Sequence, residues 1–357
     1  MTRSLDDLLK NVSEKVARRP AVDIPTETPA CLCENRYYFI KRIASGSRTF
    51  DVCPHCNPRN LCRVCNGTGS LVSINPTTGQ EELVPNSCEC LIWEHRVSRL
   101  NASGVPEKYL LAEFSFDNIR YGNKHLDQNM ADKFEENQAL IRNFCEQADS
   151  IIKRGVTPGE KYFLTLVGPV GTGKTYFAIC ALKDLILNFG HSGKFIDFQS
   201  LLNKIRDSYT KKTSEDDIMN PLRLTDVLLI DEFGKGRTEN EWEIEKLDDL
   251  VNSRYNSGRV TIITSNYLPP ELLKEMPTPS AGNFKPKTHS SQWFLQDDSA
   301  RNPRAETYWT TTLPERIGER MYDRIVEASL FIDFIGIPSF RKSQACDFLR
   351  RFQKETT

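Results

Sequence analysis

Residues 168–175 form a glycine-rich segment with the chemistry of a phosphate-binding loop. The segment consists of Gly168, Pro169, Val170, Gly171, Thr172, Gly173, Lys174 and Thr175, which is the pattern G-x-x-x-x-G-K-[ST]. It follows an apolar run and precedes a helix-like run, which is the context of strand, loop and helix that the pattern requires. Glycines let the backbone wrap closely around phosphates, so that its N–H groups point at the negative charge. Lys174 is expected to reach the β- and γ-phosphates of a nucleotide, and the Thr175 hydroxyl to hold Mg²⁺.

Two adjacent carboxylates end a second apolar run. Residues 227–230 are typical of a buried strand and lead directly into Asp231 and Glu232. Paired acids repel each other when no cation lies beside them. We therefore expect Asp231 to hold Mg²⁺ through water and Glu232 to orient and deprotonate the attacking water. Taken alone, the pair is better explained as an acidic turn after a core strand, and its order after the glycine-rich loop favours the catalytic interpretation.

A polar residue follows a third apolar run, where Thr264 and Ser265 lead into Asn266. An asparagine at the end of a strand can donate a hydrogen bond to the γ-phosphate or to the attacking water. Simple strand termination also explains it, because asparagine is common at such positions. Only its order after the two nucleotide motifs favours a role for Asn266 in catalysis.

Eight cysteines fall in four close pairs between residues 31 and 90. They are Cys31, Cys33, Cys53, Cys56, Cys62, Cys65, Cys88 and Cys90. Four close pairs of thiolates suit tetrahedral Cys₄ zinc sites, so about two zinc ions per chain are expected. Sequential grouping gives each site one C-x-C arm and one C-x-x-C arm, and a nested grouping satisfies the spacing as well. A disulfide or redox cluster and a [4Fe–4S] cluster are the other interpretations.

Length and composition indicate a soluble protein with more than one domain. The chain has 357 residues, of which 39% are hydrophobic and 27% charged, with a formal net charge of −1. The chain as a whole therefore has no excess of positive charge that would attract nucleic acid, although this composition is compatible with a local basic face. No apolar run approaches the roughly 18 residues that a membrane-spanning helix needs. Because the N-terminus also lacks an apolar signal core, a cytoplasmic location is expected.

The composition divides the chain into two predicted domains. Residues 1–100 are expected to hold an N-terminal helix and a cysteine-rich zinc domain, which zinc would fold because few apolar residues are available for a core. The apolar face of the helix, between residues 5 and 16, suits either packing on its own domain or docking on a partner. Residues 101–357 are expected to form the nucleotide-binding domain.

Strands and helices alternate in this second domain. Apolar runs predict strands near 162–167, 194–198, 226–230, 260–265 and 330–334, with helices near 174–188, 199–209, 241–256 and 313–327 and a long amphipathic helix ahead of the first strand. This alternation predicts an α/β fold with a parallel five-stranded sheet and helices on both faces. Phosphate would then lie beyond the carboxyl ends of the strands.

The second domain resembles the AAA+ ATPases of the DnaC/DnaI-type replicative helicase loaders, which are relatives of the IstB transposition ATPases. The resemblance covers roughly residues 104–345. Matching stretches lie at 104–109, 114–118, 168–175, 198–209, 228–234, 241–242, 252–255, 263–266, 315–324 and 336–341. The stretch from Cys62 to Cys90 also resembles a zinc module that some of these loaders carry in front.

The resemblance assigns further residues to the site. Arg324 matches the arginine finger, which completes the site of a neighbouring subunit and implies an ATP-dependent homo-oligomer. Arg341 matches the second sensor, an arginine that contacts the nucleotide of its own subunit. A solvated helix face is the alternative explanation of these arginines.

Two features depart from the family pattern. Residues 267–312 are polar and proline-rich and are interpreted as a surface insertion. The pair Asp231 and Glu232 stands where many loaders have two aspartates. Because glutamate is the usual base in AAA+ ATPases, hydrolysis is expected to be intact.

The resemblance implies an ATPase that loads a hexameric replicative DNA helicase onto single-stranded DNA. The N-terminal region would grip the helicase, and hydrolysis would release it. An IstB-like transposition ATPase is the alternative within the same fold. A zinc-dependent nucleic-acid or protein scaffold with a structural nucleotide site is the alternative from another class. Basic residues around Tyr209 offer a contact for single-stranded DNA, which a solvated helix end explains at least as well.

Overall fold

The computed structural model describes residue 33 and residues 36–75, 79–114, 128–235, 241–274, 311–337 and 339–340. The chain divides into two compact units, Met1–Val97 and Ser98–Thr357. The predicted N-terminal helix, Cys31, Arg341 and most of the expected insertion at 267–312 lie outside the described residues.

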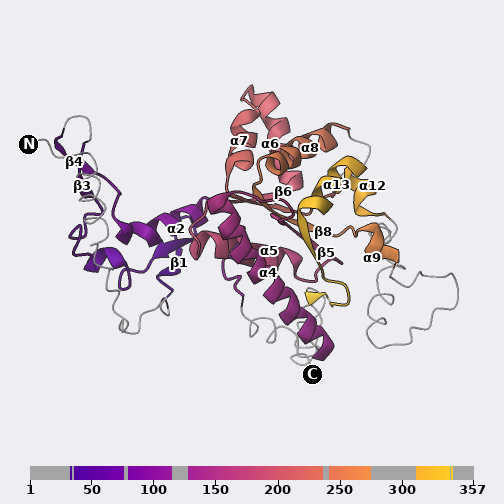
Figure 1. Ribbon diagram of the computed structural model, residues 1–357, viewed down its shortest axis with the longest axis horizontal. Coiled ribbons are helices and arrows are strands. Elements are labelled where there is room, and N and C mark those ends of the chain that lie inside the picture. The colour runs from indigo at the N-terminus through magenta and orange to yellow at the C-terminus, as the bar shows by residue number, and fades with distance from the viewer. Residues whose placement is uncertain are drawn as a thin grey trace, which may run out of the picture. The chain divides into compact units, whose positions relative to one another are not determined.

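The second unit is built around a parallel sheet of five strands (Figure 1). The strands are β5 (Phe163–Val167), β6 (Gly193–Asp197), β7 (Val227–Asp231), β8 (Val260–Ser265) and β9 (Ser329–Asp333), in the spatial order β6-β7-β8-β5-β9. Strands β5, β7 and β8 are buried along their whole length, as is typical of parallel strands covered on both faces. The predicted α/β fold class is therefore confirmed.

Helices cover both faces of this sheet. They are α4 (Gln128–Arg154), α5 (Lys174–Leu187), α6 (Phe198–Lys211), α7 (Asp216–Leu224), α8 (Glu241–Asn256), α9 (Pro270–Lys274), α12 (Leu313–Ile317) and α13 (Glu319–Ala328), and a further helix, α2, spans Ile92–Asn101. Figure 1 shows α4 and α5 on one face, with α6, α7, α8 and α13 on the other. Among the residues that the structure describes, no helix is long and apolar enough to cross a membrane.

Two helical features differ from the prediction. Helix α7 was not predicted. It contains Pro221, and proline is unfavourable in the interior of a helix. The single helix expected at 313–327 is split into α12 and α13 at Gly318, whose φ of 87° and ψ of 144° lie outside the helical region.

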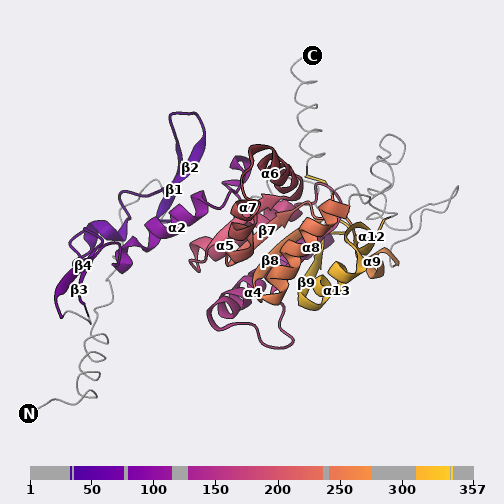
Figure 2. The same cartoon turned by 90° about the horizontal axis from the view of Figure 1, so that it is seen from above.

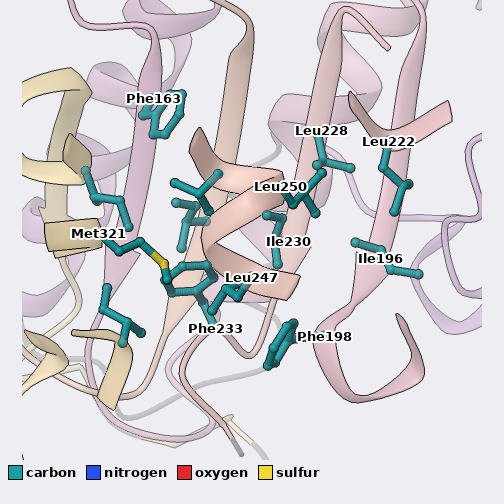
Figure 3. Packing of buried hydrophobic residues seen from close by; sticks show 14 of the residues in the cluster. Phe163, Ile196, Phe198, Leu222, Leu228, Ile230, Phe233, Leu247, Leu250 and Met321 are labelled. Carbon is teal, nitrogen blue, oxygen red and sulfur yellow. The ribbon is translucent and has the colours of Figure 1, made fainter. Parts of the chain in front are cut away.

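An apolar core fills the space between the sheet and the helices of one face (Figure 3). Leu228 and Ile230 of β7 meet Leu247 and Leu250 of α8, and all four side chains are at most 3% exposed. Burial of each such side chain stabilises the fold by roughly 1.5–3 kcal/mol. The core therefore holds β7 in place immediately before Asp231.

Arg254 of α8 is charged and yet fully buried. Its guanidinium donates hydrogen bonds to the carbonyl oxygens of Leu222 at 2.8 Å and Thr225 at 2.9 Å, and to Oγ1 of Thr261 at 2.9 Å. Burial lowers its pKa to about 9. The side chain thus links the end of α7 to β8 by satisfying carbonyl groups that the core would otherwise leave unpaired.

The first unit contains two antiparallel hairpins and short 3₁₀ turns. Strand β1 (Tyr38–Arg42) pairs with β2 (Arg48–Val52), and β3 (Leu71–Ile74) pairs with β4 (Glu81–Val84). The turns η1 (Pro58–Leu61) and η2 (Glu89–Leu91) lie in the same unit, and η3 (Glu107–Tyr109) belongs to the second unit. The buried clusters of the first unit consist mainly of cysteines, so its apolar core is small.

Candidate functional site

The glycine-rich loop joins β5 to α5 at the carboxyl edge of the sheet. Gly168, Gly171 and Gly173 all have a positive φ, at 141°, 86° and 98°. The φ of Gly171 favours glycine, because residues with a Cβ atom rarely adopt this conformation. The loop leads directly into the first turn of α5, and the N-terminus of a helix favours an anion.

A cavity of about 400 Å³ opens beside this loop. Its polar lining includes Lys174, Thr175, Glu232, Thr264 and Asn266, and its apolar lining includes Leu111, Ala112, Phe134, Phe177 and Phe340. A cavity of this volume is typical of sites that bind small molecules or cofactors. The cavity therefore brings predicted loop residues together with two residues predicted at strand ends, Glu232 and Asn266.

Asp231 ends β7 directly opposite the glycine-rich loop and is 9% exposed. Its Oδ1 atom accepts hydrogen bonds from Oγ1 of Thr175 at 2.8 Å and Oγ1 of Thr264 at 2.6 Å. Hydroxyl and carboxylate oxygens are the ligand types that Mg²⁺ prefers. The residues present therefore fit the magnesium site that the sequence predicted at Thr175 and Asp231.

Burial raises the pKa of the Asp231 carboxyl, although its two hydroxyl partners act in the opposite direction. For an acid, a raised folded-state pKa means that the ionised form is disfavoured in the folded protein. The contribution of this group to stability falls as the pH rises from its unfolded pKa through its raised folded pKa. A cation at the carboxylate would offset that cost.

Glu232 adopts a left-handed backbone conformation with a φ of 58°, which is uncommon for a residue other than glycine. Its N–H group donates to Oγ1 of Thr264 at 3.1 Å, and the N–H group of Phe233 donates to the carbonyl oxygen of Thr264 at 2.8 Å. The carboxylate forms an ion pair with Lys235. Backbone strain of this kind persists only where the surroundings enforce it, and it is concentrated at functional sites.

The structure places the two predicted arginines differently. Nη1 of Arg324 lies 3.1 Å from Oδ1 of Asp248, an ion pair between α13 and α8. Arg324 does not line the described cavity of its own chain. Arg341 lies outside the described residues, and its neighbour Phe340 lines the cavity.

Sequence reasoning did not single out the segment around Leu110 as part of the site. The buried Nζ of Lys183 donates to the carbonyl oxygens of Leu110 and Ala112, both at 2.7 Å. The Tyr176 hydroxyl accepts from the N–H group of Glu113 at 3.2 Å and donates to its carbonyl oxygen at 3.0 Å. Both sets of hydrogen bonds come from α5. The helix that follows the loop therefore also holds the segment that contributes Leu111 and Ala112 to the lining of the cavity.

The cysteines form two groups in the first unit. The ligand atoms of Cys62, Cys65, Cys88 and Cys90 all lie within 4.8 Å of one another, as do those of Cys33, Cys53 and Cys56. All seven of these side chains are buried free thiols, and Cys31 lies outside the described residues. The observed arrangement is the sequential grouping and not the nested one.

The spacing within these groups suits a tetrahedral metal. The Sγ atoms of Cys62 and Cys88 are 3.6 Å apart, and those of Cys65 and Cys90 are 3.5 Å apart. Four sulfurs at about 2.3 Å from a zinc ion lie roughly 3.7 Å from one another, whereas a disulfide bond needs about 2.05 Å. The two groups can therefore bind zinc as thiolates.

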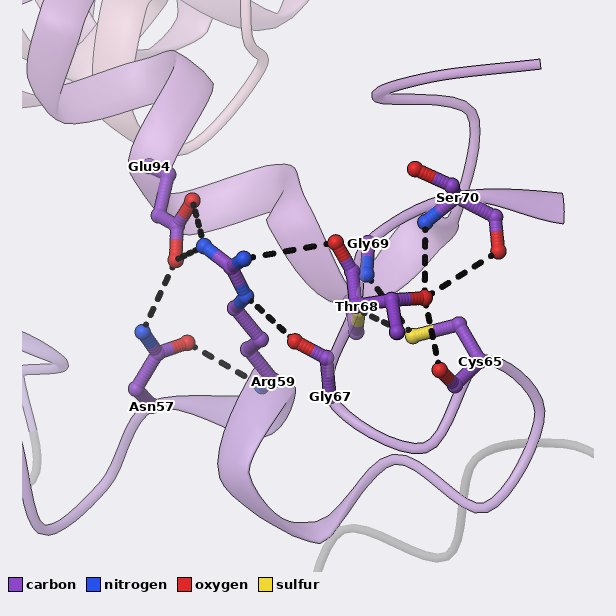
Figure 4. A network of polar contacts seen from close by, with 9 residues as sticks. Asn57, Arg59, Cys65, Gly67, Thr68, Gly69, Ser70 and Glu94 are labelled. Atoms are coloured by element: carbon purple, nitrogen blue, oxygen red, sulfur yellow. Dashed lines mark hydrogen bonds and ion pairs between the residues drawn. The ribbon is translucent and has the colours of Figure 1, made fainter. Parts of the chain in front are cut away.

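Polar contacts hold the turn that carries Cys65 (Figure 4). The N–H group of Gly69 donates to Sγ of Cys65 at 3.2 Å. Nε of Arg59 donates to the carbonyl oxygen of Gly67 at 2.7 Å, and its Nη1 lies 3.2 Å from Oε2 of Glu94. Arg59 thus connects the metal-binding turn to α2, which orients the thiols from outside the cluster.

The strand order, the glycine-rich loop after β5 and the acidic pair after β7 together define the class, which is an AAA+ P-loop protein. The family of IstB-like ATP-binding proteins matches residues 159–271. The chain is 32% identical over 197 residues to the replicative helicase loader DnaC of Escherichia coli K12, a match that covers 52% of this chain and 75% of the loader. The chain therefore belongs to the DnaC/IstB family.

Other relatives and solved structures are also similar. A putative ATP-binding protein of the insertion sequence IS1162 from Pseudomonas fluorescens is 31% identical over 127 residues, covering 35% of this chain and 52% of that protein. The crystal structure of the DnaC helicase loader matches with 21% identity and a TM-score of 0.42, covering 64% of this chain and 99% of the loader. That of DnaI matches with 16% identity and a TM-score of 0.39, covering 64% and 94%.

The two cysteine groups predict that the protein binds about two zinc ions per chain. Elemental analysis with a parallel titration of the thiols measures this content. Replacing Cys62 and Cys65 by serine should reduce the content to about one ion, because a site that keeps only two thiolates is not closed. Cys145→Ala removes a buried thiol outside both groups and should leave the content unchanged. Metal-free protein with oxidised thiols would contradict the zinc assignment.

Proposed function

We propose that this chain is an ATPase that loads a replicative DNA helicase onto single-stranded DNA. Membership of the DnaC/IstB family and the similarity to proteins named replicative helicase loaders support this role. The observation that carries the ATPase part is the buried Asp231 carboxylate, which accepts hydrogen bonds from Thr175 and Thr264, two residues that line the cavity together with Glu232.

In this proposal each polar residue of the cavity has a separate task. Mg²⁺ held by Thr175 and Asp231 would neutralise charge on the phosphates. Nζ of Lys174, which donates to the carbonyl oxygen of Pro169, turns to the β- and γ-phosphates. Glu232 leaves Lys235 and accepts the proton of the attacking water, while Asn266 orients that water.

Arg324 is proposed to act in a neighbouring subunit. It pairs with Asp248 and is not among the residues that line the described cavity of its own chain, which is compatible with a finger that works in trans. A trans-acting finger requires an oligomer, which we propose to assemble with ATP around the single strand. ATP would drive this assembly because it binds the assembled state better than the free one.

Two substitutions separate nucleotide binding from hydrolysis. Lys174→Ala should abolish ATP binding and helicase loading together, because it removes the cation at the phosphates. Glu232→Gln should keep ATP binding and lower turnover by roughly 10²–10⁴-fold, the range typical of a lost general base. Turnover is measured with and without single-stranded DNA, with the exposed Glu319→Gln as a control. Loading that survives Lys174→Ala would refute the mechanism.

The same measurements address the alternatives. An IstB-like transposition ATPase would hydrolyse ATP but capture a transposase instead of a helicase in a pull-down. A scaffold with a structural nucleotide site would show no turnover although Glu232 is intact. The cysteine-rich unit favours the loader, since the IstB type usually lacks such a module.

We propose further that the β3–β4 hairpin carries the helicase contact. Val72 lies opposite Leu83, and Ile74 lies opposite Glu81 on the same face of the hairpin. Val72, Ile74 and Leu83 are 62%, 68% and 68% exposed. Exposed apolar side chains that gather on one face, with a carboxylate at its end, suit a partner surface that is apolar with a basic margin.

Replacing Val72 and Leu83 by serine tests this contact. Each apolar side chain buried in a complex contributes roughly 1.5–3 kcal/mol, so helicase affinity should fall by at least about tenfold. Zinc content and ATP turnover should not change. The control replaces Ser73 by alanine and Glu82 by glutamine on the opposite face of the hairpin. Helicase affinity equal to that of the unaltered protein would contradict this part of the proposal.

A further inference from the structure

The β1–β2 hairpin presents two arginines directly opposite each other near its end. Arg42 of β1 pairs in register with Arg48 of β2, and both side chains are exposed. Like charges in directly opposed positions destabilise a hairpin. Lys41 lies on the opposite face of the hairpin and pairs with Asp51 at 3.3 Å. The hairpin therefore places two positive charges side by side on one face near its end.

The sequence around the hairpin is basic although the whole chain is not. Between residues 35 and 80 the basic residues are Arg36, Lys41, Arg42, Arg48, Arg59 and Arg63, and the only acidic residue is Asp51. Over the whole chain the formal net charge is −1. The positive charge of this segment is thus local, and a local basic surface attracts polyanions at a rate and affinity that depend on salt.

The base of the hairpin is held from both sides. The N–H group of Cys53 donates to the carbonyl oxygen of Tyr37 at 2.8 Å, and Phe39 packs against the first cysteine group. On the other face the ring of Tyr38 lies 5.8 Å from that of Phe50 and 6.3 Å from that of Trp93. These contacts fix the direction in which the hairpin presents its charges.

The connecting loop leaves room for a close approach. The N–H group of Ile43 donates to the carbonyl oxygen of Ser47, and that of Gly46 to the carbonyl oxygen of Ile43, both at 2.9 Å. Between Ile43 and Arg48 the side chains are short, at Ala44, Ser45, Gly46 and Ser47. All residues from Lys41 to Arg48 are exposed. Figure 2 shows the β1–β2 hairpin as a long projecting finger.

We infer that Arg42 and Arg48, the basic tip, bind the phosphate backbone of a single DNA strand. Guanidinium groups form paired, charge-assisted hydrogen bonds with phosphate oxygens. Each phosphate of a DNA strand carries one negative charge, so two neighbouring arginines can each contact one phosphate. This inference rests on the proposed function for the identity of the polyanion, and it adds a DNA contact outside the ATPase unit.

Of the basic residues around Tyr209, Arg206 is already engaged within the protein. Arg206 of α6 pairs with Glu243 at 2.6 Å and stacks over the ring of Trp242 at 5.0 Å. The Tyr209 hydroxyl donates to the carboxylate of Glu215. Contact of DNA with these two side chains would have to displace packing between helices.

The test measures binding of a fluorescent oligothymidine to the full chain without nucleotide, over a range of salt concentrations. Replacing Arg42 and Arg48 by glutamine should weaken binding by about tenfold. The slope of log affinity against log salt should fall by about 1.4, or 0.7 for each lost phosphate contact. Replacing both by lysine should keep the slope. Removing two exposed cations at the end of α4, with Lys153→Gln and Arg154→Gln, should leave both quantities unchanged.

Zinc content and the unfolding temperature verify that the glutamine pair is folded, and its unfolding temperature should not fall, because a repulsive pair is removed. Unaltered oligothymidine binding by this folded variant would overturn the inference. Loss of helicase capture with unaltered oligothymidine binding would overturn it too, and would assign the tip to an acidic protein surface. Failure of the proposed function has a different signature, namely absence of ATP turnover or helicase capture in the unaltered protein.

Discussion

One buried carboxylate organises the carboxyl edge of the central sheet. Oδ1 of Asp231 accepts hydrogen bonds from Thr175 at the start of α5 and from Thr264 near the end of β8, so it joins three elements that meet at the sheet edge. Thr264 also holds the backbone of Glu232 in its left-handed conformation. The loop, the acidic pair and the following strand are therefore one connected unit, and displacement of any one of them would disturb the others.

The two units are stabilised by different kinds of interaction. In the second unit apolar strands are covered on both faces, and a buried arginine satisfies the carbonyl groups at one end of the sheet. In the first unit buried cysteines take the place of an apolar core, so metal binding and folding are expected to be coupled. This difference leaves the hairpins of the first unit free to expose apolar and basic side chains, because they contribute little to a core.

The sequence predicted the elements whose patterns are local. All five strands were predicted within a few residues, three of them because they are buried apolar runs, and the glycine-rich loop followed from its spacing. Helix α7 was not predicted; it contains Pro221, and proline is unfavourable inside a helix. The break at Gly318 was not predicted because the apolar periodicity does not mark it. The two hairpins of the first unit were not predicted because the cysteine pairs around their strands are the dominant sequence pattern of this region. The strain at Glu232 and the bonds of Thr264 arise from tertiary contacts that no local pattern contains.

The central claim is that Asp231 and Thr175 form a magnesium site for a bound nucleotide. Titration calorimetry of ATP with and without Mg²⁺, on the unaltered protein and on Asp231→Asn, tests it most directly. Asparagine keeps an oxygen for the two hydroxyl groups but removes the charge. The account predicts that Mg²⁺ tightens ATP binding to the unaltered protein and that the variant loses this gain while it still binds metal-free ATP. A variant that retains the full gain would contradict the account.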